Sequence, residues 1–253
     1  MAVLALPPRE SSAIYLDADP NGLTLLHGVL HVADAETGAI FRVDGSLLTS
    51  LPGDGDAREL VRGIAAAPDG ALYAATRHAV YRITPDGSLI ELDLPAEPCR
   101  LAVACRGRAV YTSQFYNGPD GPYDGSVVRI ADGRRTTIAR GFNKPVGLAW
   151  VGDSLLVTDA VQRGVFAIDG RRYVRALAAP DARPDSICAY TADSALVTTY
   201  DAELHRGAVL RVWLDGRSCE VASGPWEPRG IATDGDLVFV SERHGGRILV
   251  LAL

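Results

Sequence analysis

The sequence predicts an all-β fold, and three observations support that prediction. The composition combines 47% hydrophobic residues with 26 glycines and 15 prolines, which suits many short strands joined by tight turns. No stretch shows the periodicity of an amphipathic helix. A unit of three apolar runs separated by turns, clearest at residues 62–87 where two turns are Pro-Asp-Gly, recurs so that six copies fill the chain. The period averages about 42 residues, as in propeller blades, so we expect a six-bladed β-propeller of four-stranded antiparallel blades.

The repeats run from about residue 21 to the end of the sequence and leave no room for a domain boundary, so residues 1–253 are expected to form a single propeller domain. Expected strands are residues 23–26, 30–33, 40–43 and 47–51 in the first blade, 90–94 at the end of the second, 111–113 and 127–130 in the third, 148–151, 155–158, 165–168 and 173–177 in the fourth, and 187–190, 195–199, 209–213 and 219–222 in the fifth.

The two ends of the chain are expected to meet in one blade. Residues 3–6 and 14–16 read as strands but precede the first complete repeat. The sixth repeat has strands at residues 231–233, 237–241 and 248–251 and then ends without an outer strand. An N-terminal strand paired with residues 248–251 would close the ring and cover both free sheet edges.

Charge and cysteine content exclude several classes of protein. A net charge of −6 and an isoelectric point near 5.4 argue against nucleic-acid binding, which relies on an excess of basic residues. The four cysteines lack Cys-x-x-Cys spacing and are expected to be buried free thiols, with a disulfide as the second interpretation. The first residues resemble neither a signal peptide nor a membrane anchor, so we expect a cytoplasmic protein without a membrane partner. The sequence leaves the oligomeric state open.

The candidate site follows from propeller geometry. The innermost strand of each blade starts on the face that carries the connection between the second and third strands, so both sets of residues meet at one mouth of the central channel. The candidate residues are Asn21, Arg62, Arg100, Asp185 and Arg229 at strand starts, and Tyr116, Asp159, Tyr200, His205, Glu242 and His244 in connections. The connections at residues 114–126 and 200–207 are unusually long, and the first is expected to act as a lid.

The arginines at strand starts indicate a negatively charged ligand. Like charges in a narrow channel are costly unless an anion or a carboxylate neutralises them. A small anionic metabolite could do so. Alternatively, Arg62 and Arg229 pair with Asp34, Asp185 or Glu242 and form a purely structural ring, and both arrangements can hold together.

Histidines recur at equivalent connections of three repeats. His78, His205 and His244 occupy these positions, and a histidine near neutral pH is well suited to transfer protons. We assign His244 and Glu242 as the proton-transfer pair. No Gly-x-Ser-x-Gly, His-Glu-x-x-His or Gly-x-x-x-x-Gly-Lys motif supports a serine hydrolase, a zinc protease or a nucleotide-phosphate site.

The repeat pattern resembles a known superfamily. Pro-Asn-Gly-Leu at residues 20–23, residues 63–73 with their Pro-Asp-Gly turn, and Pro-Asp-Ser-Ile at residues 184–187 are similar to repeats of the six-bladed propellers that include gluconolactonase, regucalcin and strictosidine synthase. Related repeats also occur in non-catalytic NHL-type propellers. The resemblance spans nearly the whole chain and implies a small-molecule pocket at the channel mouth.

The resemblance also implies a divalent ion such as Ca²⁺, held by a Glu at the first blade start, Asn residues at the third and fourth, and an Asp at the fifth. When the inner-strand starts are compared one by one with these ligands, only Asp185 is the same residue type, because Asn21, Arg100 and Val146 stand in place of the other ligands. We therefore predict neither a metal ion nor another cofactor. Strictosidine synthase places a catalytic Glu at the sixth start, where this chain has Arg229, so its condensation reaction is not expected.

The predicted function is hydrolysis of a lactone-like bond in a small anionic metabolite, with bacterial specialised metabolism as the expected setting. Asp185 and Asn21 would act on and orient the substrate, while Arg62 and Arg229 would stabilise an oxyanion. One alternative is a lyase, isomerase or cyclase using the same residues. Another is a non-catalytic ligand-binding or scaffold propeller.

Overall fold

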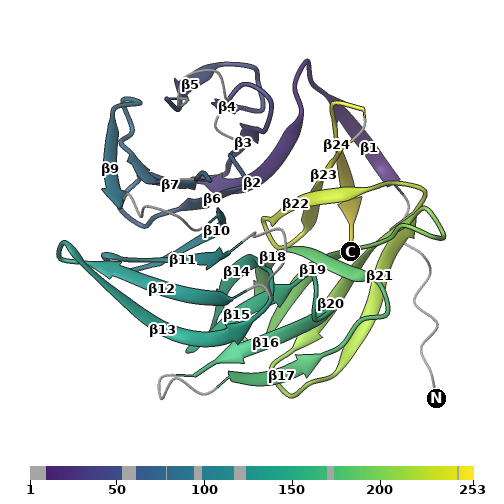
Figure 1. Ribbon diagram of the computed structural model, residues 1–253. Helices are drawn as coiled ribbons and strands as arrows, with labels where there is room; N and C mark the ends of the chain where they lie inside the picture. Colours follow the sequence, from purple (N-terminus) through teal and green to yellow (C-terminus); the bar gives the residue numbers. More distant parts are fainter. Residues whose placement is uncertain are drawn as a thin grey trace.

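The computed structural model describes residues 10–52, 61–77, 79–93, 99–116, 124–169, 174–243 and 245–253, and these residues form twenty-four strands and no helix (Figure 1). The strands make six four-stranded antiparallel sheets arranged as blades around a centre, which confirms the predicted fold.

The blades follow one another along the chain, and each of the first five is a simple meander. Blade 1 contains β2 (Pro20–Leu26), β3 (Val29–Asp34), β4 (Ala39–Arg42) and β5 (Leu47–Ser50); blade 2 contains β6 (Gly63–Ala66), β7 (Leu72–Ala75), β8 (Val80–Ile83) and β9 (Leu89–Asp93); blade 3 contains β10 (Cys99–Arg106), β11 (Ala109–Phe115), β12 (Gly125–Ala131) and β13 (Arg134–Phe142). Blade 4 contains β14 (Pro145–Val151), β15 (Ser154–Asp159), β16 (Gly164–Ile168) and β17 (Val174–Ala178); blade 5 contains β18 (Arg183–Thr191), β19 (Ser194–Asp201), β20 (Arg206–Trp213) and β21 (Ser218–Gly224).

Blade 6 joins the two ends of the chain. It contains β22 (Pro228–Thr233), β23 (Leu237–Glu242) and β24 (Arg247–Ala252), and its outer strand is β1 (Glu10–Tyr15). Ile14 pairs with Ile248 in an antiparallel register. The predicted N-terminal closure is therefore confirmed for the second of the two candidate segments, and residues 3–6 lie outside the described residues.

The core is divided into six apolar layers, one between each pair of neighbouring blades. Leu72 of blade 2, for example, packs with Ile40 of blade 1, and both side chains are fully buried. Alternate side chains of each strand fill the layers on the two sides of its blade. The backbone edge of each inner strand is thereby left facing the central channel.

Five of the six inner strands begin with a bulge. Pro20 pairs with Asp34 and Gly22 with Ala33, so Asn21 is the extra residue. The same shift of register occurs near the starts of β10, β14, β18 and β22. A bulge re-aims the side chain of its extra residue, which explains why residues at the strand starts can point into the channel.

Three described cysteines, Cys105, Cys188 and Cys219, are free thiols, as predicted. Cys219 is exposed, however, because it lies on the outer strand β21, and Cys105 and Cys188 are only partly buried, so the expectation of buried thiols was wrong for Cys219 and holds in part for the other two. Burial raises the pKa of Cys105 to about 11 and that of Cys188 to about 12, which keeps both thiols protonated at neutral pH. The described part of the chain holds no helix of the length and hydropathy required for a membrane span.

Candidate functional site

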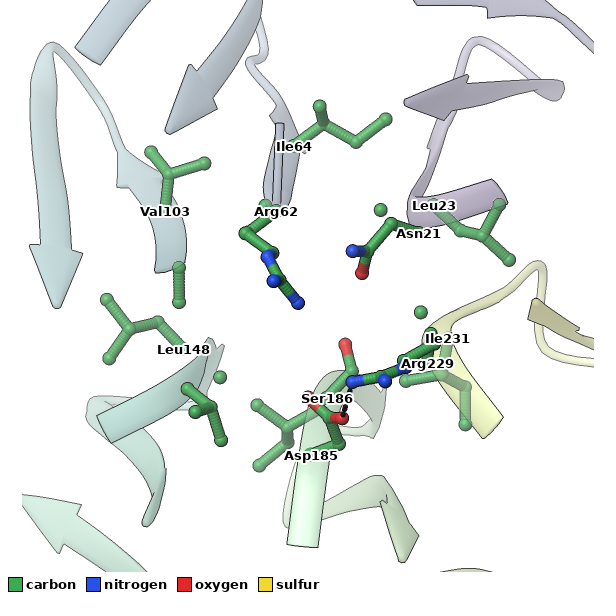
Figure 2. A pocket seen from close by; sticks show the side chains of 17 residues that line it. Asn21, Leu23, Arg62, Ile64, Val103, Leu148, Asp185, Ser186, Arg229 and Ile231 are labelled. Carbon is green, nitrogen blue, oxygen red and sulfur yellow. Dashed lines mark hydrogen bonds and ion pairs between the residues drawn. The ribbon is translucent and has the colours of Figure 1, made fainter. Parts of the chain in front are cut away.

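The first residues of the six inner strands surround a cavity of about 60 Å³ at one mouth of the channel. Its polar side chains are Asn21, Arg62, Asp185, Ser186 and Arg229. Figure 2 shows Arg62 and Asn21 pointing into the centre, whereas Leu23 and Leu148 point away from it. A cavity of this size has room for a few water molecules or one small head group.

A row of ion pairs leads from this cavity across the face of blade 6. The Arg229 guanidinium lies 3.1 Å from the Asp185 carboxylate and 3.0 Å from that of Glu227. Glu227 also accepts a bond from Arg243 at 3.0 Å. The side chains of Arg229 and Glu227 are only 12% and 11% exposed, so these charges depend strongly on one another.

Asp185 is the carboxylate nearest the centre of the cavity. Burial raises its pKa, and the positive charges of Arg229, Arg183 and Arg62 oppose that rise without cancelling it. A carboxylate whose pKa is raised in a polar cleft accepts a proton more readily than an exposed one. Asp185 therefore has the environment of a base as well as that of an ion-pair partner.

Buried hydroxyl groups hold the backbone under three of the four charged or amide side chains. In each case the hydroxyl lies on the second strand of one blade and donates to a carbonyl of the next blade's inner strand. The bonds run from Thr158 to Asp185 (2.7 Å), from Thr198 to Arg229 (3.2 Å) and from Ser241 to Asn21 (2.9 Å). The Thr198 and Ser241 oxygens also accept an N–H from their own inner strand, at 2.9 and 2.7 Å. Each of these two hydroxyls is thus a bridge between two blades.

The glycine that follows the channel residue in four of the six inner strands (Gly22, Gly63, Gly147 and Gly230) has a steric reason, whereas Ser186 follows Asp185. A Cβ at Gly230 would lie 2.1 Å from the Asn21 carbonyl oxygen, and one at Gly147 would lie 2.6 Å from the Thr158 hydroxyl. Only a residue without a side chain lets neighbouring inner strands come this close. The same approach allows the hydroxyls to reach the next blade.

Known structures share this architecture. No protein-family model matches the chain, and no curated sequence is similar to it. Among solved structures, a gluconolactonase from Xanthomonas campestris is 19% identical, with 100% of this chain and 94% of that chain covered and a TM-score of 0.76. Regucalcin, a calcium-binding protein from Agrobacterium tumefaciens, is 13% identical (97% and 93% covered, TM-score 0.70), and virginiamycin B lyase from Staphylococcus aureus is 19% identical (96% and 98%, TM-score 0.67). These structures share the fold of this chain, a six-bladed β-propeller.

The predicted resemblance to gluconolactonase and regucalcin is confirmed as a likeness of fold. The resemblance to strictosidine synthase remains a prediction. At such low identity the likeness does not carry a reaction or a substrate with it.

The residues at the channel mouth do not fit a divalent ion. Asp185 and Asn21 supply oxygens, but Asp185 is bonded to Arg229, and Val146 offers no ligand atom. Hard divalent ions require several oxygen ligands and are repelled by neighbouring guanidinium groups. Within the residues that the structure describes, no three His, Cys, Asp or Glu side chains are close enough together to hold a metal.

Four of the predicted site residues come together in the propeller. Asn21, Arg62, Asp185 and Arg229 all line the channel cavity. Arg100 pairs with Gln114 just before the bulge of β10, and Pro20 pairs with Asp34 just before the bulge of β2. Arg100 is therefore equivalent to Pro20 and lies one residue before the residue that faces the channel in its blade. The equivalence between Arg100 and Asn21 expected from the repeats is therefore off by one residue, because the bulge begins after Arg100. Its side chain lies outside the described part of the structure.

Two predicted carboxylates have other partners. Asp159 is fully buried and accepts the backbone N–H groups of Asn143, Lys144, Val161 and Gln162. It shapes a turn and does not line the channel cavity. Glu242 accepts a hydrogen bond from the Nε of Arg247, also away from the cavity. The structure thus gives both carboxylates structural contacts, and their predicted roles in the site gain no support from them.

The remaining predicted residues are dispersed. Tyr200 lines a separate depression on blade 5, where its hydroxyl lies 3.4 Å from Nδ1 of His205. Tyr116 is 51% exposed at the start of the long connection of blade 3. His244 and His78 lie outside the described residues, as do residues 117–123 of the expected lid.

Two acidic residues of the mouth escaped the sequence analysis. Glu227 neutralises Arg229, and Asp19 lies close enough to Arg229, Arg243 and Arg62 to interact with them electrostatically. Burial and the nearby Asp34 raise the pKa of Asp19. A signal for both was present, because each directly precedes the proline that opens an inner strand: Asp19-Pro20-Asn21 and Glu227-Pro228-Arg229.

Proposed function

We propose that this protein is an enzyme that hydrolyses a lactone-like bond of a small anionic metabolite at the charged mouth of its channel. The observation that carries the proposal is the convergence of Arg62, Arg229, Asp185 and Asn21 on one cavity of about 60 Å³. That volume suits the reacting head group alone. The rest of the substrate would extend into the neighbouring cleft of about 700 Å³, which Asp19 and Arg243 line on the same face.

The chemistry assigns one task to each side chain. Asp185 takes a proton from a water molecule as the water oxygen attacks the lactone carbonyl carbon. The carbonyl π electrons move to oxygen, and the Arg62 guanidinium stabilises the resulting oxyanion. Collapse of the intermediate breaks the bond to the ring oxygen, which receives the proton back from Asp185 and leaves a hydroxy acid. Arg229 orients Asp185, and Asn21 orients the substrate.

The names of the fold neighbours agree with this proposal. One is described as a gluconolactonase important in glucose secondary metabolic pathways, and another is a lyase that was also studied as a catalytically inactive variant with quinupristin. Propellers of this fold can therefore carry enzymatic sites for small molecules. In this chain, Asp185 and Arg62 supply the base and the cation that hydrolysis of a lactone requires.

One observation favours a second candidate, a non-catalytic propeller. Arg229 lies between two carboxylates, Asp185 and Glu227, and is largely buried. An arginine held in this way can serve only to close the channel and fix blade 5 against blade 6. In that case its removal would cost stability and change no binding.

Three substitutions at the mouth separate the two candidates. Hydrolysis is measured on paired γ- and δ-lactones that carry either a free carboxylate or its methyl ester. We expect the carboxylate form to be the better substrate, and Arg62→Gln and Asp185→Asn each to lower kcat/KM by about 10²- to 10³-fold, the range for losing a transition-state contact. Arg229→Gln should lower both kcat/KM and the melting temperature, because it leaves Asp185 and Glu227 without their shared partner.

Arg206→Gln is the matched control, since Arg206 is an arginine in an ion pair, with Glu220, and is 48% exposed, but it lines neither the cavity nor the neighbouring cleft. It should change the rate less than threefold. The same assay repeated after exhaustive chelation should give an unchanged rate. Large stability losses with no change in rate or affinity in all three variants would favour the structural propeller, and activity restored only by Ca²⁺ would contradict the metal-free chemistry.

A further inference from the structure

A second cavity, of about 330 Å³, lies between blades 1 and 2. It is at the opposite end of the inner strands from the charged mouth, because β2 starts beside Asn21 and ends at Leu26 in this cavity. Leu26, Leu72 and Ile83 make its walls largely apolar, and His31 and Arg42 are among its few polar side chains. A predominantly apolar cavity of about this volume with a few placed polar groups is typical of small-molecule sites.

His31 and Arg42 form the polar end of this cavity. They are direct partners on the antiparallel strands β3 and β4, so their side chains leave the same face of blade 1 with Cβ atoms roughly 5 Å apart. A ligand that meets both must therefore carry its two polar groups close together. The apolar walls then receive the remainder of the molecule.

The imidazole of His31 offers a hydrogen-bond acceptor. Its Nδ1 lies 3.0 Å from the carbonyl oxygen of Val29, and since a carbonyl can only accept, Nδ1 carries the proton. Burial lowers the pKa of His31; Arg42 lowers it further, while the bond to Val29 and the Asp44 charge oppose the change. The ring is therefore neutral at neutral pH, and Nε2 has no hydrogen-bond partner among the described residues.

Arg42 offers a cation. Its guanidinium donates to the Ser46 hydroxyl at 3.3 Å and forms no ion pair within the described part of the chain. The nearby carboxylates are engaged elsewhere: Asp44 accepts the Ser46 N–H and hydroxyl at 2.9 and 2.6 Å, and Asp69 is bonded to Arg82 at 2.9 Å. An incoming carboxylate would give Arg42 the bidentate partner that its geometry favours.

His27 forms part of the rim of the cavity. It occupies a two-residue turn with Gly28, and both residues have positive φ, 51° and 77°. This turn type favours Asn-Gly, so a histidine is an uncommon choice. Its Cε1 atom lies 3.5 Å from where a Cβ of Gly70 would be, so the ring reaches from blade 1 to the turn of blade 2.

We propose that this cavity is a second ligand site, for a small apolar carboxylic acid with a hydroxyl group near its carboxylate. The carboxylate binds Arg42, the hydroxyl donates to Nε2 of His31, and the apolar body packs on Leu26, Leu72 and Ile83. The site is independent of the function proposed for the channel, because the two cavities lie at opposite ends of the inner strands and share no residue.

Isothermal titration calorimetry of the whole protein tests the proposal with 3-hydroxybenzoate as the probe. Benzoate lacks the hydroxyl and 3-hydroxybenzyl alcohol lacks the carboxylate, so both should bind more weakly. Arg42→Gln should weaken binding of 3-hydroxybenzoate about 10- to 100-fold, as expected for losing a charge-assisted hydrogen bond. His31→Phe should reduce the affinity for 3-hydroxybenzoate to that for benzoate while leaving benzoate binding unchanged.

Arg62→Gln at the channel mouth is the matched control and should leave binding of the probe unchanged. A loss of binding with Arg62→Gln but not with Arg42→Gln would place the probe in the channel and overturn the proposal. Absence of saturable binding up to about 10 mM would also overturn it. If His31→Phe fails to fold, the comparison of 3-hydroxybenzoate with benzoate on the unaltered protein still tests the hydroxyl contact, and equal affinities would contradict it.

Discussion

The two halves of the propeller ring join their inner strands in different ways. From blade 4 through blades 5 and 6 to blade 1, a buried hydroxyl on each second strand reaches a carbonyl of the next inner strand. Blades 1 and 2 have Ala33 and Ala75 at the corresponding positions. There the link between blades lies deeper in the channel, where Thr24 accepts the N–H of Ala66 at 3.1 Å.

This difference shows that the same repeat can either fix a channel residue of the next blade through a buried hydroxyl or leave that residue without this contact. A hydroxyl opposite the residue that follows the channel residue lets a blade fix the neighbouring channel residue from below. Ser113 of blade 3 also has such a hydroxyl, and it accepts the N–H of Ala102 of its own inner strand at 3.1 Å. Asp185, Arg229 and Asn21 are each fixed by a hydroxyl of the preceding blade, whereas Arg62 follows a blade whose equivalent residue is Ala33. The charged mouth therefore has one side that is fixed by hydroxyl bridges and one side that, among the described residues, lacks them.

The largest effect is expected within blade 6, where β1 completes the sheet and joins the two ends of the chain. Deleting residues 1–15 removes β1 and exposes the edge of β24. We expect the melting temperature to fall by more than about 10 °C, because several kcal/mol are lost and each shifts the midpoint by roughly 2–4 °C in a protein of this size. Differential scanning calorimetry measures this shift.

Tyr15→Ser is the control for the deletion, since this β1 side chain is 72% exposed. It should change the midpoint by only a degree or two. A deleted protein that melts like the full chain would show that the ring does not depend on its terminal strand.

The next effect compares the two halves directly. Thr198→Val removes the hydroxyl that bridges Ser186 and Arg229 and leaves buried backbone groups without their partner, at a cost of about 1–3 kcal/mol. Thr24→Val removes the link to Ala66 in the other half and should cost a similar amount. Only the Thr198 variant should also weaken ligand binding or activity at the charged mouth.

Urea unfolding and a binding or rate measurement on both variants provide the comparison. Equal effects of the two substitutions on binding would mean that the hydroxyl bridges stabilise the ring without positioning the site. An unchanged stability of Thr198→Val would show that the bridge is not formed.

The smallest effect concerns Asp19, at the boundary between blades 6 and 1. Burial raises its pKa in the folded protein, so the folded state binds this proton more tightly than the unfolded state does. Its contribution to stability is fully present below the ordinary aspartate pKa and is lost as the pH rises through the raised value. Asp19→Asn should therefore be slightly more stable than the natural chain at pH 7.

That advantage should shrink as the pH falls from the raised pKa toward the ordinary one, and melting curves across this range measure it. An advantage that grows on acidification would mean that the pKa of Asp19 is lowered, with the arginines of the mouth outweighing burial. The exposed Asp236→Asn serves as a control for a general effect of charge.

The fold was predictable because its signals are local and repeated. An Asp-Gly turn and a steady period mark every blade, and the missing outer strand of the last repeat indicated the closure. The central residues of the site were predictable for the same reason, since a strand start has a defined place in a propeller. Asn21, Arg62, Asp185 and Arg229 were found in this way.

The rest of the site depends on pairing that a single sequence does not display. Asp159 and Glu242 occupy the right loops, but their carboxylates bind nearby N–H groups. Glu227 lies just before a strand start and became visible only through its bond to Arg229. The bulge of β10 begins after Arg100, so the residue that faces the channel is one position further along the chain. The length of the repeat does not reveal this shift.

The pairing of β1 with β24 also bears on how the chain reaches its folded state during synthesis. Tyr15 pairs with Arg247, 232 positions further along the chain. At the usual pace of translation, this partner emerges roughly 10 to 50 s after β1 does. Every other described strand pairs with neighbours in its own repeat, so β1 waits longest for its partner. Until then its backbone groups form an open edge that can pair with other nascent chains.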